Sequence, residues 1–109
     1  MAEQAIIQKA TEFHKQLGGT IFAFPIEENN PHSEYAVVVY AGNQYFVYPQ
    51  ASDVSLAASG VVTVLDLMKQ AGLAIDYEND VRFISYKIQI DAPNVVMRRL
   101  KNQGGLTNV

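Results

Sequence analysis

The sequence predicts a single α+β domain in which three helices pack on a five-stranded antiparallel sheet, in the order α-β-β-β-α-β-β-α. Three observations predict this fold class. The chain has 109 residues, which is the usual size of one domain. Apolar residues recur at helical spacing near its start and in its middle. Runs rich in Val, Ile, Tyr and Phe, separated by short turn sequences, indicate antiparallel strands between and after these helices.

The N-terminal segment is expected to be an amphipathic helix. Its apolar residues follow one another at spacings of three and four, which places them on one face of a helix. These residues are Ala2, Ile6, Ala10, Phe13 and Leu17. Gly18 and Gly19 come next and readily adopt the left-handed conformation that commonly ends a helix.

Three strands are expected after this helix. Residues 20–26 (TIFAFPI) form the first, with Pro25 indicating an edge position or the end of the strand. Residues 34–41 (EYAVVVYA) and 44–48 (QYFVY) form a hairpin, because the intervening Gly42 accepts the positive φ of a two-residue turn.

The two-residue turn also predicts the register of this hairpin. Ala41 would lie opposite Gln44, which places Tyr40 opposite Tyr45 and Val38 opposite Val47. The other face would carry Tyr35, Val37, Val39, Phe46 and Tyr48. Both faces are apolar, so each needs a cover, either from the chain itself or from a partner.

The middle of the chain is less regular. Residues 49–59 are compatible with a loop or with a short helix capped by Ser52 or Asp53. Residues 60–71 are expected to form a helix that is apolar around most of its circumference and ends at Gly72. Such a helix should be buried on more than one side.

The last third of the sequence predicts a second hairpin and a third helix. Residues 73–77 and 81–90 would be the strands, because apolar and polar residues alternate from Ile84 to Ile90. Residues 92–103 would be the helix, with Asp91 as its N-cap and Pro93 in its first turn. Met1 and residues 104–109 are expected to fray.

Composition narrows the function classes. Charged residues make up 17% of the chain, below the roughly 25% that is typical, which favours an oligomer or a surface that a partner covers. The absence of cysteine excludes disulfides and thiol chemistry. No run resembles a signal peptide or a membrane span, so a cytoplasmic protein without a membrane partner is expected.

The charge distribution does not favour nucleic acid as a partner. The net charge is −3, although basic residues gather toward the C-terminal end. These residues are Arg82, Lys87, Arg98, Arg99 and Lys101. Cations are common in the last turns of a helix, where they complement its dipole, and an acidic chain repels phosphate overall.

No motif in the chain carries recognisable chemistry. His14 lies beside the apolar stripe of the first helix and is expected to be a half-buried, hydrogen-bonded side chain. His32 stands in an acidic turn whose residue spacing matches no metal motif, and the acids from Asp76 to Asp80 lack the glycine of a calcium loop. The sequence therefore predicts no catalytic residue, metal site or cofactor, while a site assembled from scattered residues stays open.

The order of elements from Ala2 to Gln103 resembles that of the class I chaperones of type III secretion and of proteins that share their fold. The resemblance includes no motif, and the last helix expected here is shorter than theirs often is. It implies a homodimeric α+β protein that holds an extended segment of a partner and uses no nucleotide.

These observations favour a non-enzymatic, homodimeric module that holds a polypeptide partner. Two surplus apolar surfaces are candidates for the partner or dimer interface. One is a face of the hairpin, with Val38, Tyr40, Tyr45 and Val47. The other is the outer side of the helix at residues 60–71, with Val62 and Leu67. The alternative is a small-molecule-binding protein or small enzyme whose pocket, lined by Tyr and Phe, lies between sheet and helices.

Overall fold

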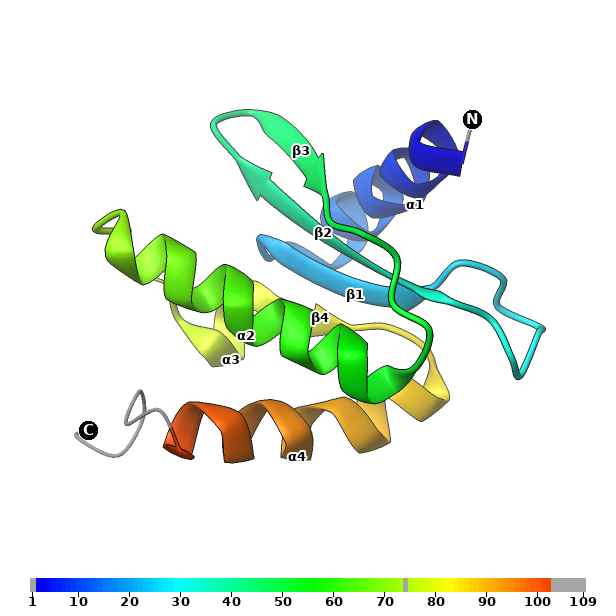
Figure 1. Ribbon diagram of the computed structural model, residues 1–109. Coiled ribbons are helices and arrows are strands. Elements are labelled where there is room, and N and C mark those ends of the chain that lie inside the picture. Colours follow the sequence, from blue (N-terminus) through cyan, green and yellow to red (C-terminus); the bar gives the residue numbers. More distant parts are fainter. Residues whose placement is uncertain (1, 74, 103–109) are drawn as a thin grey trace.

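A four-stranded mixed sheet lies between two layers of helices (Figure 1). The computed structural model describes residues 2–73 and 75–102. The elements in chain order are α1 (Ala2–Leu17), β1 (Ile21–Pro25), β2 (Tyr35–Ala41), β3 (Gln44–Val47), α2 (Val54–Gln70), α3 (Tyr77–Asp80), β4 (Val81–Phe83) and α4 (Tyr86–Asn102). The strands are arranged in the order β3-β2-β1-β4. The pairs β1–β2 and β2–β3 are antiparallel, and β1–β4 is parallel.

The first helix and the first hairpin are confirmed. α1 ends at Leu17, and the N–H of Gly18 donates to the carbonyl oxygen of His14 at 2.9 Å. The β2–β3 register pairs Ala41 with Gln44 and Tyr40 with Tyr45, as the turn predicts. Gly42 and Asn43 have φ values of 58° and 65°, the pattern of a type I′ turn, whose twist suits antiparallel strands.

The middle of the chain forms one helix where the sequence left a choice. α2 begins at Val54, and the carboxylate of Asp53 caps it by accepting the N–H of Leu56 at 2.9 Å. Residues 54–59 of the stretch that is compatible with a loop or a helix therefore belong to the helix expected at residues 60–71, while residues 49–53 precede it. The C-cap is Ala71, and Gly72 follows with a φ of 79°.

The prediction of a five-stranded antiparallel sheet with three helices is wrong. Among the described residues of the expected second hairpin, only Val81–Phe83 is a strand, and it pairs with β1 in the parallel direction. The acids expected at the hairpin tip form the short helix α3 instead, where Asp76 accepts the N–H of Glu78 at 3.0 Å. In the described residues, the structure therefore has one mixed sheet of four strands, together with four helices.

The last helix begins earlier than the sequence predicts. Ser85 has a φ of 90° and turns the chain from β4 into α4, which starts at Tyr86. Pro93 lies inside this helix, so Asp91 is not an N-cap. The helix starts earlier because an apolar residue recurs at every fourth position and forms one buried face. These residues are Ile88, Ala92, Val96 and Leu100. The helix end expected at Gln103 lies outside the described residues. So do Met1 and residues 104–109, which are expected to fray.

Alternate residues of the strands pack into two core clusters, one on each side of the sheet. Along β1, Ile21 and Ala23 contact the layer of α2 and α4, while Phe22 and Phe24 contact the layer of α1. The radius of gyration is 13.1 Å, close to the value of about 13 Å expected for one domain of 100 residues. Among the described residues, every helix is too short or too polar to cross a membrane.

Candidate functional site

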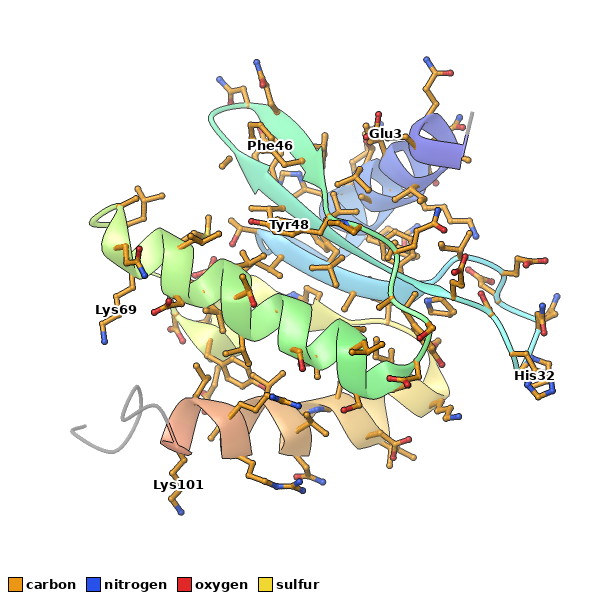
Figure 2. All side chains as sticks on the ribbon, viewed as in Figure 1. Glu3, His32, Phe46, Tyr48, Lys69 and Lys101 are labelled. Atoms are coloured by element: carbon orange, nitrogen blue, oxygen red, sulfur yellow. The ribbon has the colours of Figure 1, made fainter. Side chains whose placement is uncertain are left out.

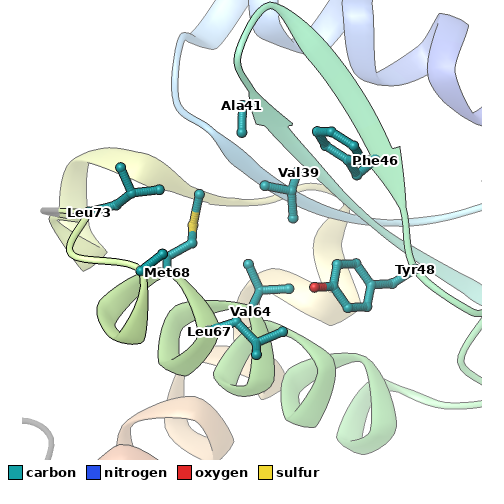
Figure 3. Close-up of a pocket in the computed structure, with 9 residues that line it drawn as sticks. Val39, Ala41, Phe46, Tyr48, Val64, Leu67, Met68 and Leu73 are labelled. Atoms are coloured by element: carbon teal, nitrogen blue, oxygen red, sulfur yellow. The ribbon is translucent and has the colours of Figure 1, made fainter.

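An apolar groove lies between the β2–β3 hairpin and the C-terminal half of α2 (Figure 3). Its cavity volume is about 180 Å³. Among the described residues of the lining, Tyr48 alone has a side-chain oxygen or nitrogen atom, and its hydroxyl points toward Val64 and Leu67 in Figure 3. The lining consists of Val39, Ala41, Phe46, Tyr48, Val64, Leu67, Met68, Ala71 and Leu73.

The groove exists because the helical layer does not extend over β3. α2 packs on β2 and β1, and α4 packs on β1 and β4, so the face of β3 on this side is left partly open. Phe46 on β3 is consequently 49% exposed. Leu67 on α2 is 48% exposed and Leu73 just after it is 51% exposed. Large apolar side chains gathered around one groove are typical of an interaction surface.

The backbone of β3 forms an open edge beside this groove. Among the described residues, β3 is the end strand of the sheet and pairs with β2 alone. The N–H of Tyr40 donates to the carbonyl oxygen of Thr20, the residue before β1, at 2.7 Å. The backbone groups of Tyr40 therefore face β1, and Tyr40 does not exchange hydrogen bonds with the opposite Tyr45 on β3. The backbone groups of Tyr45, and by the same alternation those of Val47, therefore point away from the sheet.

Nothing within β3 blocks this edge. Natural edge strands commonly carry a lysine, a proline or a bulge that prevents another strand from pairing with them. The four residues of β3 are Gln, Tyr, Phe and Val, and each of the four pairs regularly with β2. The first proline comes two residues after the strand, at Pro49. The strand is short, and among the described residues the outward-facing backbone groups of Tyr45 and Val47 have no hydrogen-bond partner.

The opposite face of the hairpin is covered by α1 through a cluster of aromatic rings. The Nδ1 atom of His14 lies 3.0 Å from the hydroxyl of Tyr45, and the His14 ring centroid lies 4.3 Å from that of Tyr40. Phe22 completes the cluster at 5.9 Å from His14. His14 is thus half-buried and hydrogen-bonded, as the sequence predicts.

The structure separates the six candidate interface residues. The four on the hairpin lie together under α1, where Val38 is fully buried and Tyr40, Tyr45 and Val47 are half-buried. Val62 is 3% exposed and belongs to the core cluster beneath α2 and α4. Leu67 alone among the six reaches the open groove.

Sequence reasoning missed Phe46 and Leu73 as groove residues. Phe46 was placed on the correct face of the hairpin, but the pattern does not tell how far the helices cover that face. The sequence holds no signal for this, because the exposure of Phe46 depends on where α2 lies relative to β3 in space.

The groove lacks the groups of an acid–base catalyst. The described residues that line it include no carboxylate, imidazole or amine. Burial raises the pKa of the Tyr77 phenol, but Tyr77 packs against the larger core cluster and does not line the groove. His32 is exposed in the loop before β2, and among the described residues no three His, Asp or Glu side chains are grouped to hold a metal ion.

Comparisons with protein-family models, with curated proteins and with solved structures found no match to this chain. The resemblance to type III secretion chaperones accordingly stays a prediction. The groove and the strand edge are the features on which a function can be argued.

Proposed function

We propose that the protein is a non-enzymatic binding module that holds an extended segment of a polypeptide. The segment adds to the sheet as a further strand beside β3 and places an apolar side chain in the groove. One observation carries the proposal: the open backbone edge at Tyr45 and Val47 and the apolar groove beside Phe46 belong to the same strand. In strand addition, backbone hydrogen bonds provide affinity and a pocket for alternate side chains provides specificity.

The geometry assigns separate roles to alternate residues of the bound segment. A residue opposite Phe46 projects its side chain to the groove side of the sheet, since opposed residues of paired strands share a face. When the segment runs antiparallel to β3, its two neighbours lie opposite Tyr45 and Val47 and exchange hydrogen bonds with them. A segment in which apolar residues alternate with polar ones satisfies both requirements.

A small-molecule ligand fits the groove less well. Ligand pockets commonly have volumes of about 300–1,000 Å³ and several convergent polar groups that orient the ligand. This groove is smaller, and among its described residues Tyr48 provides the one side-chain oxygen or nitrogen atom. The polar groups that a partner needs are on the strand edge instead, where only a backbone can use them. The proposal involves no cofactor, nucleic acid or membrane, and it retains the cytoplasmic setting expected from the sequence.

The test uses labelled peptides in which leucine alternates with threonine, with the leucines meant for the groove. Fluorescence anisotropy measures affinity, and amide chemical shifts in two-dimensional NMR locate the contact. We expect shifts at Tyr45, Phe46 and Val47. N-methylation of the threonine amides, which face β3, should abolish binding, while N-methylation of the leucine amides, which face away, should preserve it.

A pair of protein variants tests the groove. Leu67→Glu places a charge in the lining and should weaken peptide binding about tenfold or more. Ile90→Glu introduces the same charge at a side chain of similar exposure, 50%, on α4 outside the groove, and should leave binding unchanged. Equal effects of the two variants, or equal binding of both N-methylated peptides, would refute the proposed function.

A further inference from the structure

The open edge of β3 has the symmetry needed to pair with itself. Its free backbone groups belong to Tyr45 and Val47, which lie on either side of Phe46. If two β3 strands meet antiparallel with Phe46 opposite Phe46, Tyr45 of each copy stands opposite Val47 of the other. Such pairs exchange both of their N–H···O bonds, so all the outward-facing groups of the two residues are satisfied in both copies.

We infer that the strand that occupies this edge in the free protein is β3 of a second copy, related by a two-fold axis through Phe46. The inference rests on the proposed function, because it names the partner for the same edge. A closed, two-fold interface is the commonest arrangement by which soluble chains associate.

The side chains around the edge are compatible with this pairing. The two copies of Phe46 stand directly opposite one another on the groove side of the joined sheet, where their rings stack. Leu67 and Leu73 extend the apolar surface on the same side of each copy (Figure 3). Phe46 is 49% exposed, and Figure 2 shows it on the β2–β3 hairpin, above α2 in the view.

Charge does not oppose the contact, although each copy carries a net charge of −3. The residues of β3 and of the groove lining are all uncharged. The acids elsewhere on the two copies are screened over a Debye length of about 8 Å at physiological ionic strength. A second copy therefore meets an uncharged strand and an uncharged groove, and Glu3 of α1 is the acid that lies beside Val47.

The area available predicts a weak dimer. Phe46, Leu67 and Leu73, each about half exposed, offer roughly 250 Å² of apolar surface per copy, while stable interfaces bury about 800 Å² per partner. We therefore expect a dissociation constant in the micromolar range or weaker, in rapid exchange. A polypeptide with a better fit can displace the second copy, so dimerisation and partner binding compete for the same edge.

Cysteine cross-linking tests the position of the two-fold axis. The chain contains no cysteine, so each variant has a single thiol. Phe46→Cys places that thiol opposite its own copy, within the Cα separation of about 7 Å that a disulfide spans. Gln44→Cys, on the same strand and the same face, is the matched control, because its two copies are about 13 Å apart along the strands in this register. We expect Phe46→Cys to give at least about tenfold more disulfide dimer than Gln44→Cys under mild oxidation.

Analytical ultracentrifugation of the wild-type chain from about 10 to about 500 µM tests the dimer itself. Association should appear across this range and be lost in Phe46→Glu, but not in Ile90→Glu, with circular dichroism showing that both variants fold. A wild-type chain that stays monomeric while the leucine–threonine peptide binds overturns the inference and leaves the proposed function standing. If the chain neither associates nor binds the peptide, both fail. Equal cross-linking at positions 44 and 46 overturns the two-fold axis through Phe46.

Discussion

At the scale of single residues, two adjacent glycines after α1 have different roles. Gly18 and Gly19 both have positive φ values, 70° and 91°. A Cβ on Gly18 would meet nothing within 4 Å, but a Cβ on Gly19 would lie 3.0 Å from the carbonyl oxygen of Asp80 and 2.9 Å from the Cγ of Arg82. The Asp80 carbonyl cannot retreat easily, because it accepts the N–H of Thr20 at 2.8 Å.

We therefore predict unequal costs for Gly18→Ala and Gly19→Ala. Gly18→Ala should lower the free energy of unfolding by about 1 kcal/mol, the cost of an alanine in the left-handed region. Gly19→Ala adds a collision with backbone and should cost about 2–3 kcal/mol. Urea denaturation followed by circular dichroism measures both. Equal losses would show that the contact between residues 19 and 80 is not tight.

At the scale of elements, the sequence predicts those parts whose local signals agree. α1 and the β2–β3 register follow from a helical stripe, a glycine pair and a two-residue turn. The stretch after β4 carries two conflicting signals. Residues 84–90 alternate in the manner of a strand, yet Ile88 also begins the four-residue repeat that α4 buries. Packing of that repeat against α2 decides the outcome, and no local pattern contains this information.

Because of Pro93, the sequence predicts too late a start for α4. Replacing this proline should also stabilise the domain. Pro93 lies inside the helix and cannot donate an N–H to the carbonyl of Gln89, four residues earlier. Pro93→Ala restores this donor and removes the ring from the helix interior. We expect the free energy of unfolding to rise by about 1–2 kcal/mol, since the greater freedom of the unfolded chain offsets part of the gain. Thermal unfolding measures the change, and a lower melting temperature would contradict this account.

At the scale of the whole molecule, the two helical layers are unequal, and this inequality creates the site. Among the described residues, the cluster under α2 and α4 contains 18 buried residues and the cluster under α1 contains 6. The larger layer still leaves Phe46 half exposed, because α2 lies over β1 and β2 (Figure 1). The sequence predicted Leu67 as a surplus apolar residue, but the exposure of Phe46 depends on where two distant elements end in space. A pattern of spacing cannot supply that relation.

The unequal layers predict that α1 opens before the rest of the domain. Two residues of α1, Ile6 and Ala10, are fully buried, while α2 buries seven. Native-state hydrogen exchange should therefore show a lower opening free energy for amides in α1 than for those of Val61 and Val64 in α2. Ile6→Ala leaves a cavity and should destabilise the packing of α1 by about 2–5 kcal/mol. It should therefore widen this difference in opening free energy.

The matched substitution Ile88→Ala removes an equally buried side chain from the larger layer. It should lower the opening free energies of α2 and β1 together, because those amides exchange only when the whole domain unfolds. α1 also bonds to the edge strand through His14 and Tyr45, so its opening should speed exchange at Phe46, whose N–H faces β2. If α1, α2 and β3 exchange with one common free energy in both variants, the two layers unfold as a single unit and α1 does not control the order of the β3 edge.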